Sequence, residues 1–183
     1  MIKLELNERI YLLKRRHQIV LKLQLLPFLL IFCFDLILIF FFSIKKISWP
    51  GFLVESFPEI LNFKLNFILA FLFSLILPIL WCLIFLEITR YYLTYWVVTN
   101  RRIIEVKLNG LFNIQYSSVE LDKIQDMRAQ IKGFLPSFFR FGNLRIQTAS
   151  EKGEFVLDQI GEPEITKQVI FEAKIDSLKQ KHD

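Results

Sequence analysis

Two long apolar runs, residues 25–44 and 65–86, dominate the pattern of hydrophobic and polar positions along the chain. Each run has about the 20 residues that a helix needs to cross the hydrocarbon core of a bilayer. Backbone amides and carbonyls in hydrocarbon must find partners within the segment or in a closed barrel, and two isolated segments cannot close one. The pattern therefore predicts two transmembrane helices, with buried helices of a soluble core as the alternative.

Lysine and arginine residues around the runs predict how these helices are oriented. Residues 1–24 and the stretch after the second run are rich in both, whereas the loop over residues 45–64 carries only Lys45, Lys46 and Lys64. Positive charge is enriched on the cytoplasmic side of membrane proteins. We therefore expect both termini in the cytoplasm and the loop outside. The first run is too long for a signal peptide and lacks a cleavage pattern, so we expect it to remain as an anchor.

Aromatic residues flank the two runs in the manner of the belts that membrane proteins place at the lipid–water interface. The predicted interface anchors are Trp49 on the outer side and Tyr91, Tyr92, Tyr95 and Trp96 on the inner side. These positions agree with a helical hairpin whose two ends meet the cytoplasmic surface.

Asp35 is the one charged residue within either apolar run. A carboxylate near the bilayer centre costs at least about 2.5 kcal/mol, and such residues usually face a partner or a water-filled cavity. If the runs pack as an antiparallel hairpin, we expect Ser74 at a similar depth, where a protonated Asp35 can donate to its hydroxyl. The carbonyl that Pro78 leaves free is a second acceptor. Contact with a polar residue of another membrane subunit is the alternative.

Residues 1–24 form a basic cytoplasmic segment. On a helix drawn over residues 7–26, most of the charged residues lie apart from the apolar ones. Such an amphipathic helix can lie in the headgroup plane of a membrane. Lys14, Arg15 and Arg16 are then candidates for binding lipid headgroups. The alternative is that this cluster only sets the topology and adheres to any anionic leaflet.

Residues 87–183 change to short segments of alternating apolar and polar side chains, which is typical of strands. Strand or hairpin signals lie at residues 91–98, 103–108, 143–148 and Asn109-Gly110. After Glu162-Pro163, apolar residues recur at helical spacing among charges. We therefore predict an α+β domain in which five to seven antiparallel strands, arranged as a barrel or sandwich, are capped by a C-terminal helix.

Four short motifs carry a family resemblance. They are YWVVTNRRII at residues 95–104, VELDKIQD at residues 119–126, FRFGNLRI at residues 139–146 and RRH at residues 15–17. Together they resemble the bacterial pleckstrin-homology-like (PH-like) domains found in membrane-flanked proteins. The resemblance extends over about the whole chain, in the order two spans and then domain. Two residues of the third motif depart from it, since Phe141 and Asn143 stand where the family often shows Tyr and Asp.

This resemblance implies a membrane-tethered PH-like module of a bacterial plasma membrane, acting beside another membrane protein that is similar to it or is a second copy of it. We expect a non-catalytic interaction or scaffolding module without a cofactor. An adaptor that senses anionic membrane lipid is the second hypothesis. An accessory subunit of an export or envelope-stress system is the third, and it depends on the family resemblance alone.

Candidate catalytic and metal-binding residues are sparse. The sequence has no phosphate-binding glycine loop, paired histidines or nucleophile elbow. Its only histidines, His17 and His182, are far apart in the chain, and Cys33 and Cys82 lie in the apolar runs. These residues do not provide a ligand set for a metal. The net charge of +5 is mostly anchoring charge before the first span, so we do not expect nucleic-acid binding.

Two further features of the domain are candidates for lipid contact. Arg101 and Arg102 lie in the first predicted hairpin, where they can bind acidic headgroups or simply add to the cytoplasmic positive charge. The aromatic run over residues 134–141 can dip into the leaflet. A short helical plug over the open end of the barrel is the favoured interpretation, because a small domain needs aromatic mass in its core.

Overall fold

The chain forms two compact units, one of which is built from both ends of the sequence. A computed structural model of the protein describes residues 5, 8–45, 50–51, 64–110, 113–149 and 153–180. The first unit, here called the strand unit, contains Met1–Leu21 and Ile88–Asp183, and the second contains Lys22–Glu87. The N-terminal segment is therefore part of the strand unit, contrary to the prediction of a separate segment over residues 1–24.

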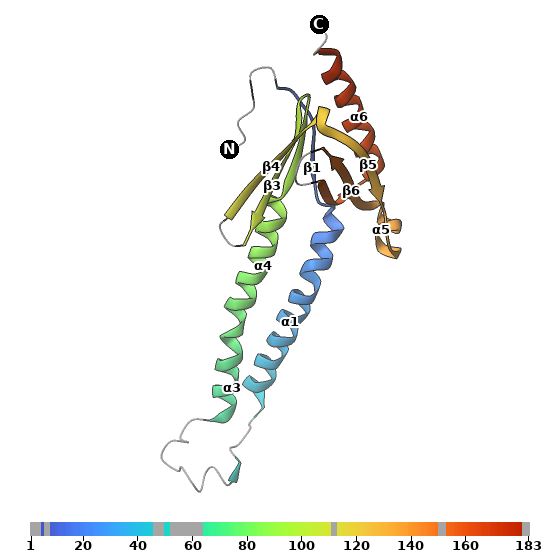
Figure 1. The fold of residues 1–183 in the computed structure, drawn as a ribbon. Helices are drawn as coiled ribbons and strands as arrows, with labels where there is room; N and C mark the ends of the chain where they lie inside the picture. Colours follow the sequence, from blue (N-terminus) through green and yellow to red (C-terminus); the bar gives the residue numbers. More distant parts are fainter. Residues whose placement is uncertain are drawn as a thin grey trace. The chain divides into compact units, whose positions relative to one another are not determined.

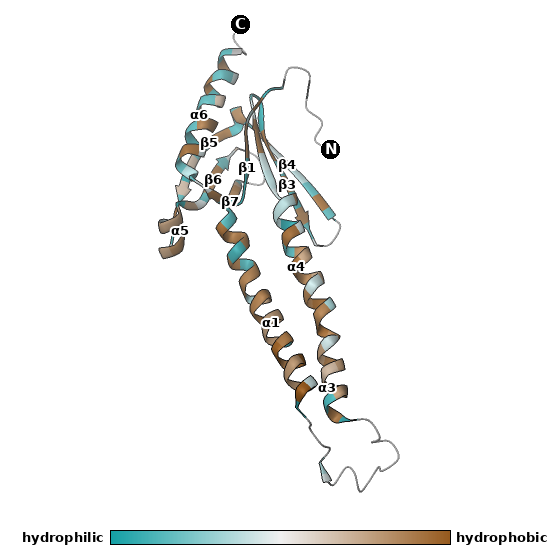
Figure 2. Cartoon of the chain, turned by 180° about the vertical axis from the view of Figure 1, so that it is seen from behind, coloured by the Kyte–Doolittle hydropathy of each residue, from teal (hydrophilic) through white to brown (hydrophobic). Residues whose placement is uncertain are grey.

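Long apolar helices make up the second unit and the residues that flank it. They are α1 (Gln18–Ile44), α3 (Leu65–Ser74) and α4 (Ile76–Leu93). Both α1 and the stretch from Leu65 to Leu93 are long and apolar enough to cross a membrane, and few of their residues are buried in the protein. Figure 2 shows hydrophobic residues along most of their length. A core helix of a soluble protein buries its apolar stripe, so these helices differ from that alternative.

The helical stretch from Leu65 to Leu93 is interrupted at Leu75, between α3 and α4, and the sequence explains the break. Pro78 has no amide hydrogen, so the carbonyl of Ser74 loses the donor it would have in a continuous helix. The amide of Leu75 donates to both Phe71 O and Leu72 O at 3.3 Å, as in a tightened final turn. The second predicted span is therefore two helices in sequence.

The strand unit contains two antiparallel sheets. The strands are β1 (Ile10–Arg15), β2 (Tyr95–Thr99), β3 (Arg102–Asn109), β4 (Asn113–Glu120), β5 (Ile124–Gln130), β6 (Phe141–Thr148) and β7 (Glu154–Gly161). The sheets have the orders β1-β2-β3-β4 and β5-β6-β7 (Figure 1). A single bridge between Arg16 and Ile160 joins them. No pairing joins β4 to β5 in the described part of the chain, so the predicted barrel is not closed.

Three short or terminal helices complete this unit. They are the 3₁₀ turn η1 (Leu121–Lys123), α5 (Phe134–Phe139) and α6 (Pro163–Gln180). The predicted C-terminal helix after Glu162 is thus confirmed as α6. Its buried residues Ile170 and Ala173 belong to the core.

The structure corrects two predictions about secondary structure. The amphipathic helix expected over residues 7–26 is wrong for Ile10–Arg15, because these residues form β1 and pair with β2. Leu, Lys and Arg favour a helix locally, but pairing with an existing strand overrides that preference. The strand expected over residues 91–98 begins only at Tyr95, because Tyr91 and Tyr92 form the last turn of α4.

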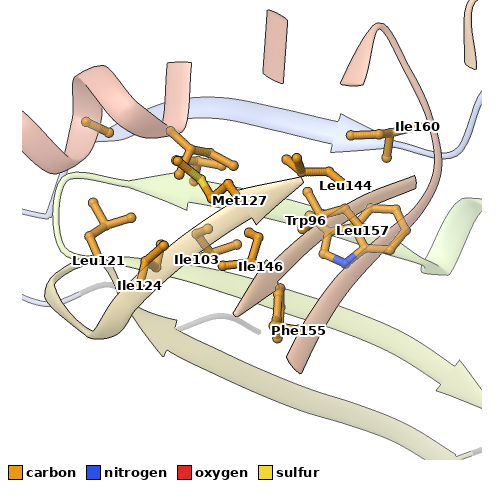
Figure 3. Packing of buried hydrophobic residues seen from close by; sticks show 13 residues of the cluster. Trp96, Ile103, Leu121, Ile124, Met127, Leu144, Ile146, Phe155, Leu157 and Ile160 are labelled. Carbon is orange, nitrogen blue, oxygen red and sulfur yellow. The ribbon is translucent and has the colours of Figure 1, made fainter. Parts of the chain in front are cut away.

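The core lies between the two sheets and α6. Figure 3 shows Trp96 and Ile103 from the first sheet together with Leu144, Ile146 and Leu157 from the second. All five are at most 1 % exposed. The alternating pattern over residues 143–148 therefore reflects one face of β6 directed into this core. In β3 the core residue is Ile103, whereas the alternating apolar residues Ile104, Val106 and Leu108 are buried on the opposite face.

The hairpin predicted at Asn109-Gly110 is confirmed. Gly110 has a φ of +73°, and Asn109 at the end of β3 is paired with Asn113 at the start of β4. A positive φ costs glycine little, which explains its presence at this turn. The turn expected at residues 151–153 lies mostly outside the described residues.

Candidate functional site

At one end of the strand unit, the residues that precede α1 are in contact with the last residues of α4 and with β7. The hydroxyl of Tyr91 donates to Arg16 O at 2.9 Å, and the guanidinium of Arg15 lies over the ring of Tyr92, 5.9 Å from its centroid. His17 donates its amide to Gln159 O at 2.8 Å. We call this region the helix-proximal end. Its hydrogen bonds fix the start of α1 beside the end of α4.

The predicted interface anchors have different environments. Tyr92 is exposed and Tyr95 is half-buried, whereas Tyr91 is buried. The prediction is wrong for Trp96, which is 1 % exposed and packs in the core, with its indole Nε1 donating to Glu105 Oε1 at 3.2 Å. A cluster of aromatic residues in the sequence does not show which of their side chains point into the core. Trp49 lies outside the described residues.

The basic residues Lys14, Arg15 and Arg16 also separate. Only Arg15 is exposed, while Lys14 and Arg16 are half-buried. Lys14 is paired in register with Trp96, which is paired with Glu105 on β3, so these three side chains lie in one row on the core side of the sheet. The Nε atom of Arg16 is buried and has no hydrogen-bond partner among the described residues.

Glu105 carries the negative charge in this polar row. Burial raises the pKa of Glu105, and this effect outweighs the opposing influence of Lys107, the Trp96 hydrogen bond and Arg16. Asp158 adds a further raising effect on that pKa. Keeping the Glu105 carboxylate ionised in this polar row therefore costs free energy.

Arg101 and Arg102 lie in a cleft of about 510 Å³ at the turn between β2 and β3. Its charged lining residues are Glu5, Arg101, Arg102, Glu120, Asp122 and Lys123. The ion pairs are Arg101 with Glu5 at 2.6 Å and Lys123 with Glu120 at 3.0 Å. The cleft therefore carries both signs of charge, and a headgroup that binds these arginines must compete with carboxylates of the same chain.

Arg102 is held most firmly. Its Nε and Nη2 atoms donate to the two carboxylate oxygens of Glu8, each at 3.0 Å, and Thr99 donates its hydroxyl to Glu8 at 2.8 Å. Burial raises the pKa of Glu8, but the hydrogen bonds from Arg102, the Glu5 backbone contact and Thr99 together lower that pKa below its ordinary value. Glu8 was missed by the sequence analysis, because nothing local distinguishes it from other carboxylates before β1.

The outer edge of β4 is open. No strand pairs with this edge among the described residues, because β4 is the last strand of its sheet. Residues 113–118 are neutral, and Ile114 and Tyr116 are exposed. Proteins usually protect such edges with lysine, proline, bulges or a covering element. An extended partner segment can therefore add to this sheet.

Asp35 is only 4 % exposed, and its Oδ2 atom has no hydrogen-bond partner in the described part of the chain. The predicted contact with Ser74 is not seen among the described residues, and the Ser74 hydroxyl donates to Phe71 O in its own helix at 2.7 Å. The ring of Phe42 stacks on that of Phe73 at 5.5 Å. In an antiparallel pair this register places Asp35 nearer to Leu80, which is also buried.

The interpretation of residues 134–141 as a plug is wrong for α5. Phe134 is 83 % exposed and Phe138 is 71 % exposed, so neither ring fills the core. Only Phe141, which begins β6, is buried. The aromatic mass of the core comes from Trp96 and Phe155 instead.

The chain matches a protein family and has weak similarity to a solved structure. A family profile described as "Bacterial PH domain" matches residues 36–174. A solved protein of the DUF1696 family with a pleckstrin-homology domain, from Shewanella loihica PV-4, is 19 % identical with a TM-score of 0.39, over 46 % of this chain and 74 % of that one. No curated protein matches the chain. The profile match confirms the family resemblance.

Proposed function

Because the chain belongs to the family of bacterial PH domains, we propose that it is a non-catalytic interaction module of a bacterial plasma membrane. In this proposal α1 and α3–α4 anchor the protein, and the strand unit works with another membrane protein at the cytoplasmic surface. Catalysis is no part of the proposal, because PH domains are generally interaction modules.

The sheet itself supports a there-and-back crossing. β1 precedes α1 and β2 follows α4, yet the two strands are paired from Ile10 with Thr99 to Arg15 with Tyr95. Strands of one sheet lie on one side of a membrane, since an open sheet does not span hydrocarbon. The helices between them therefore cross an even number of times. The many lysines and arginines outside the loop favour the cytoplasmic side for this sheet.

The open edge of β4 is the observation that carries the proposed interaction. An extended segment of a partner gains backbone hydrogen bonds by adding to such an edge, and the exposed side chains of Ile114 and Tyr116 offer apolar contacts beside it. The other edge strands differ from the neutral residues 113–118, because each carries charged residues: Lys14 and Arg15 on β1, Asp126 and Arg128 on β5, and Glu154 and Asp158 on β7. We therefore assign the interaction to β4.

The test is co-purification of the full-length protein in native lipid. A photo-crosslinker at Gln115, which is exposed on β4, should capture one defined membrane protein that also co-purifies in fixed ratio. Ile114→Lys should abolish both signals, because a lysine on an edge opposes strand addition. Ile165→Lys, at an exposed isoleucine of α6, is the matched control. A wild-type protein that purifies without such a partner contradicts the proposal.

An anionic-lipid-sensing adaptor is the second candidate function, and the exposed guanidinium of Arg15 favours it. This residue is the last of β1, three positions before the start of α1, and its guanidinium lies over Tyr92. Native mass spectrometry of the full-length protein should then show preferred retention of phosphatidylglycerol over phosphatidylcholine. Arg15→Gln should remove that preference, while equal retention of both lipids by the wild type contradicts the adaptor.

A further inference from the structure

Helix α5 presents an apolar surface to solvent. Besides the rings of Phe134 and Phe138, which stack with centroids 6.3 Å apart, Ile131 and Leu135 are also exposed. Figure 2 shows α5 as a hydrophobic segment of the strand unit. The helix is bounded by Gly133 and Arg140, which both have positive φ. The chain therefore turns sharply on either side of a single exposed apolar tip.

This tip lies at the helix-proximal end of the strand unit. Phe141, two residues after α5, stacks on the ring of His17 with a centroid distance of 5.5 Å, and His17 directly precedes α1. Arg140 accepts a hydrogen bond from the Glu162 amide at 2.8 Å, close in sequence to the Gln159 carbonyl that accepts from His17. The residues that directly follow α5 are thus linked to the point where the chain enters its first apolar helix.

The charged residues within residues 131–141 have one sign. Lys132 and Arg140 flank α5 and are exposed, and residues 131–141 contain no carboxylate. Neither cation forms an ion pair with any residue that the structure describes. Aromatic residues beside free cations suit the boundary between anionic headgroups and acyl chains.

We propose that α5 is a third membrane contact, in which Phe134 and Phe138 enter the headgroup–acyl boundary of the leaflet that α1 enters. Lys132 and Arg140 bind the anionic headgroups of that leaflet. The occupant is lipid because the tip adjoins the start of α1, so a bilayer around that helix is always at high local concentration. This inference rests on the proposed membrane anchoring.

The test measures the depth of spin labels in the full-length protein in bilayer discs. Cys33 and Cys82 are first replaced by alanine. Single cysteines are then introduced by Phe138→Cys, by Phe171→Cys as a control at an exposed aromatic residue of α6, and by Phe40→Cys within α1. Accessibility to oxygen and to a water-soluble nickel complex gives the depth of each label. The discs contain phosphatidylcholine alone or mixed with phosphatidylglycerol.

The expected result is a label at residue 138 about 5–10 Å below the headgroups, with label 171 in water and label 40 in hydrocarbon. Adding phosphatidylglycerol to the discs should lower the accessibility of label 138 to the nickel complex. This decrease should be several-fold larger in the protein that keeps Lys132 and Arg140 than in the protein that also carries Lys132→Gln and Arg140→Gln. Label 138 in water, or shielded from both reagents by protein, while label 40 is in hydrocarbon, overturns the α5 contact alone. Label 40 in water overturns the anchoring itself.

Discussion

Arg102 and Glu8 form a two-pronged ion pair in which the Glu8 side chain is fully buried and both hydrogen bonds are 3.0 Å long. The pair ties the segment before β1 to the turn between β2 and β3. Glu8→Ala removes both of these hydrogen bonds to the guanidinium, and we expect a loss of about 2 kcal/mol in the free energy of unfolding. Denaturant unfolding of the detergent-solubilised protein measures it. Glu5→Ala, at an exposed ion pair, should cost less than about 1 kcal/mol.

The same pair should make the fold sensitive to acid. Since the pKa of Glu8 is lower in the folded protein than its ordinary value of 4.5, its stabilising contribution is present above pH 4.5 and is lost as the pH falls through the folded pKa. Unfolding followed by circular dichroism at decreasing pH should show this loss. Glu8→Gln should flatten the slope but not remove it, because Arg128 and the Met127 amide also lower the pKa of Asp126. An unchanged slope in Glu8→Gln contradicts the assignment.

Glu105 should have the opposite pH dependence. Its pKa is raised in the fold, chiefly by burial, so the folded protein favours the protonated form, and ionisation costs stability once the pH rises above 4.5. We expect Glu105→Gln to raise the melting temperature at pH 8 and to leave it unchanged near pH 4, since glutamine still accepts from the Trp96 indole. A lower melting temperature at pH 8 would show that Lys107 and Arg16 stabilise the charge more than burial opposes it.

Gly142 is required by a close approach of backbone. A Cβ atom at this position would collide with the Gln130 carbonyl oxygen on β5 and lie 2.9 Å from Ile131 Cγ1. We expect Gly142→Ala to cost about 2 kcal/mol or more, measured by thermal unfolding. Gly110→Ala is the control, because its Cβ meets no atom within 4 Å. The control should lose only about 1 kcal/mol, from its positive φ.

If the protein assembles with another membrane subunit through its apolar helices, Asp35 contacts a polar residue of that subunit. Asp35→Leu should then reduce the mass of the detergent-extracted assembly by at least one subunit while the strand unit stays folded, because the carboxyl contact to the partner is lost. Asp35→Asn keeps hydrogen-bonding atoms and should retain more of the assembly. Light scattering measures both masses. An unchanged mass in Asp35→Leu rules out the partner and leaves the carboxyl as an internal feature of the hairpin.

Sequence periodicity predicted the elements that are amphipathic on their own. The alternation over residues 103–108, the hairpin at Asn109-Gly110 and the C-terminal helix all follow from local pattern, and each is present. The family motifs added the PH-like architecture, which the profile match confirms. Local pattern did not predict secondary structure that depends on pairing with a distant segment. β1, for example, is a strand because it pairs with β2, about 80 residues later in the chain.

The candidate site was less predictable for the same reason. Arg101 and Arg102 were predicted as candidates for headgroup binding. Their ion pairs with Glu5 and Glu8 were not predicted, because these carboxylates are remote in sequence and reach the arginines only through the pairing of β1 with β2. The aromatic run over residues 134–141 was assigned to the core from its composition. Composition does not show which side of a six-residue helix faces water, and Phe134 and Phe138 face it.

The pairing of β1 with β2 has a consequence for how the protein is made. β1 leaves the ribosome first, but its partner strand is translated only after the whole of α1, the loop, α3 and α4. The first sheet therefore completes late, and β1 must wait unpaired until β2 has been translated. A gene fragment that starts at residue 88 would encode a sheet whose strand β2 has lost its neighbour β1, so the strand unit has no contiguous coding sequence.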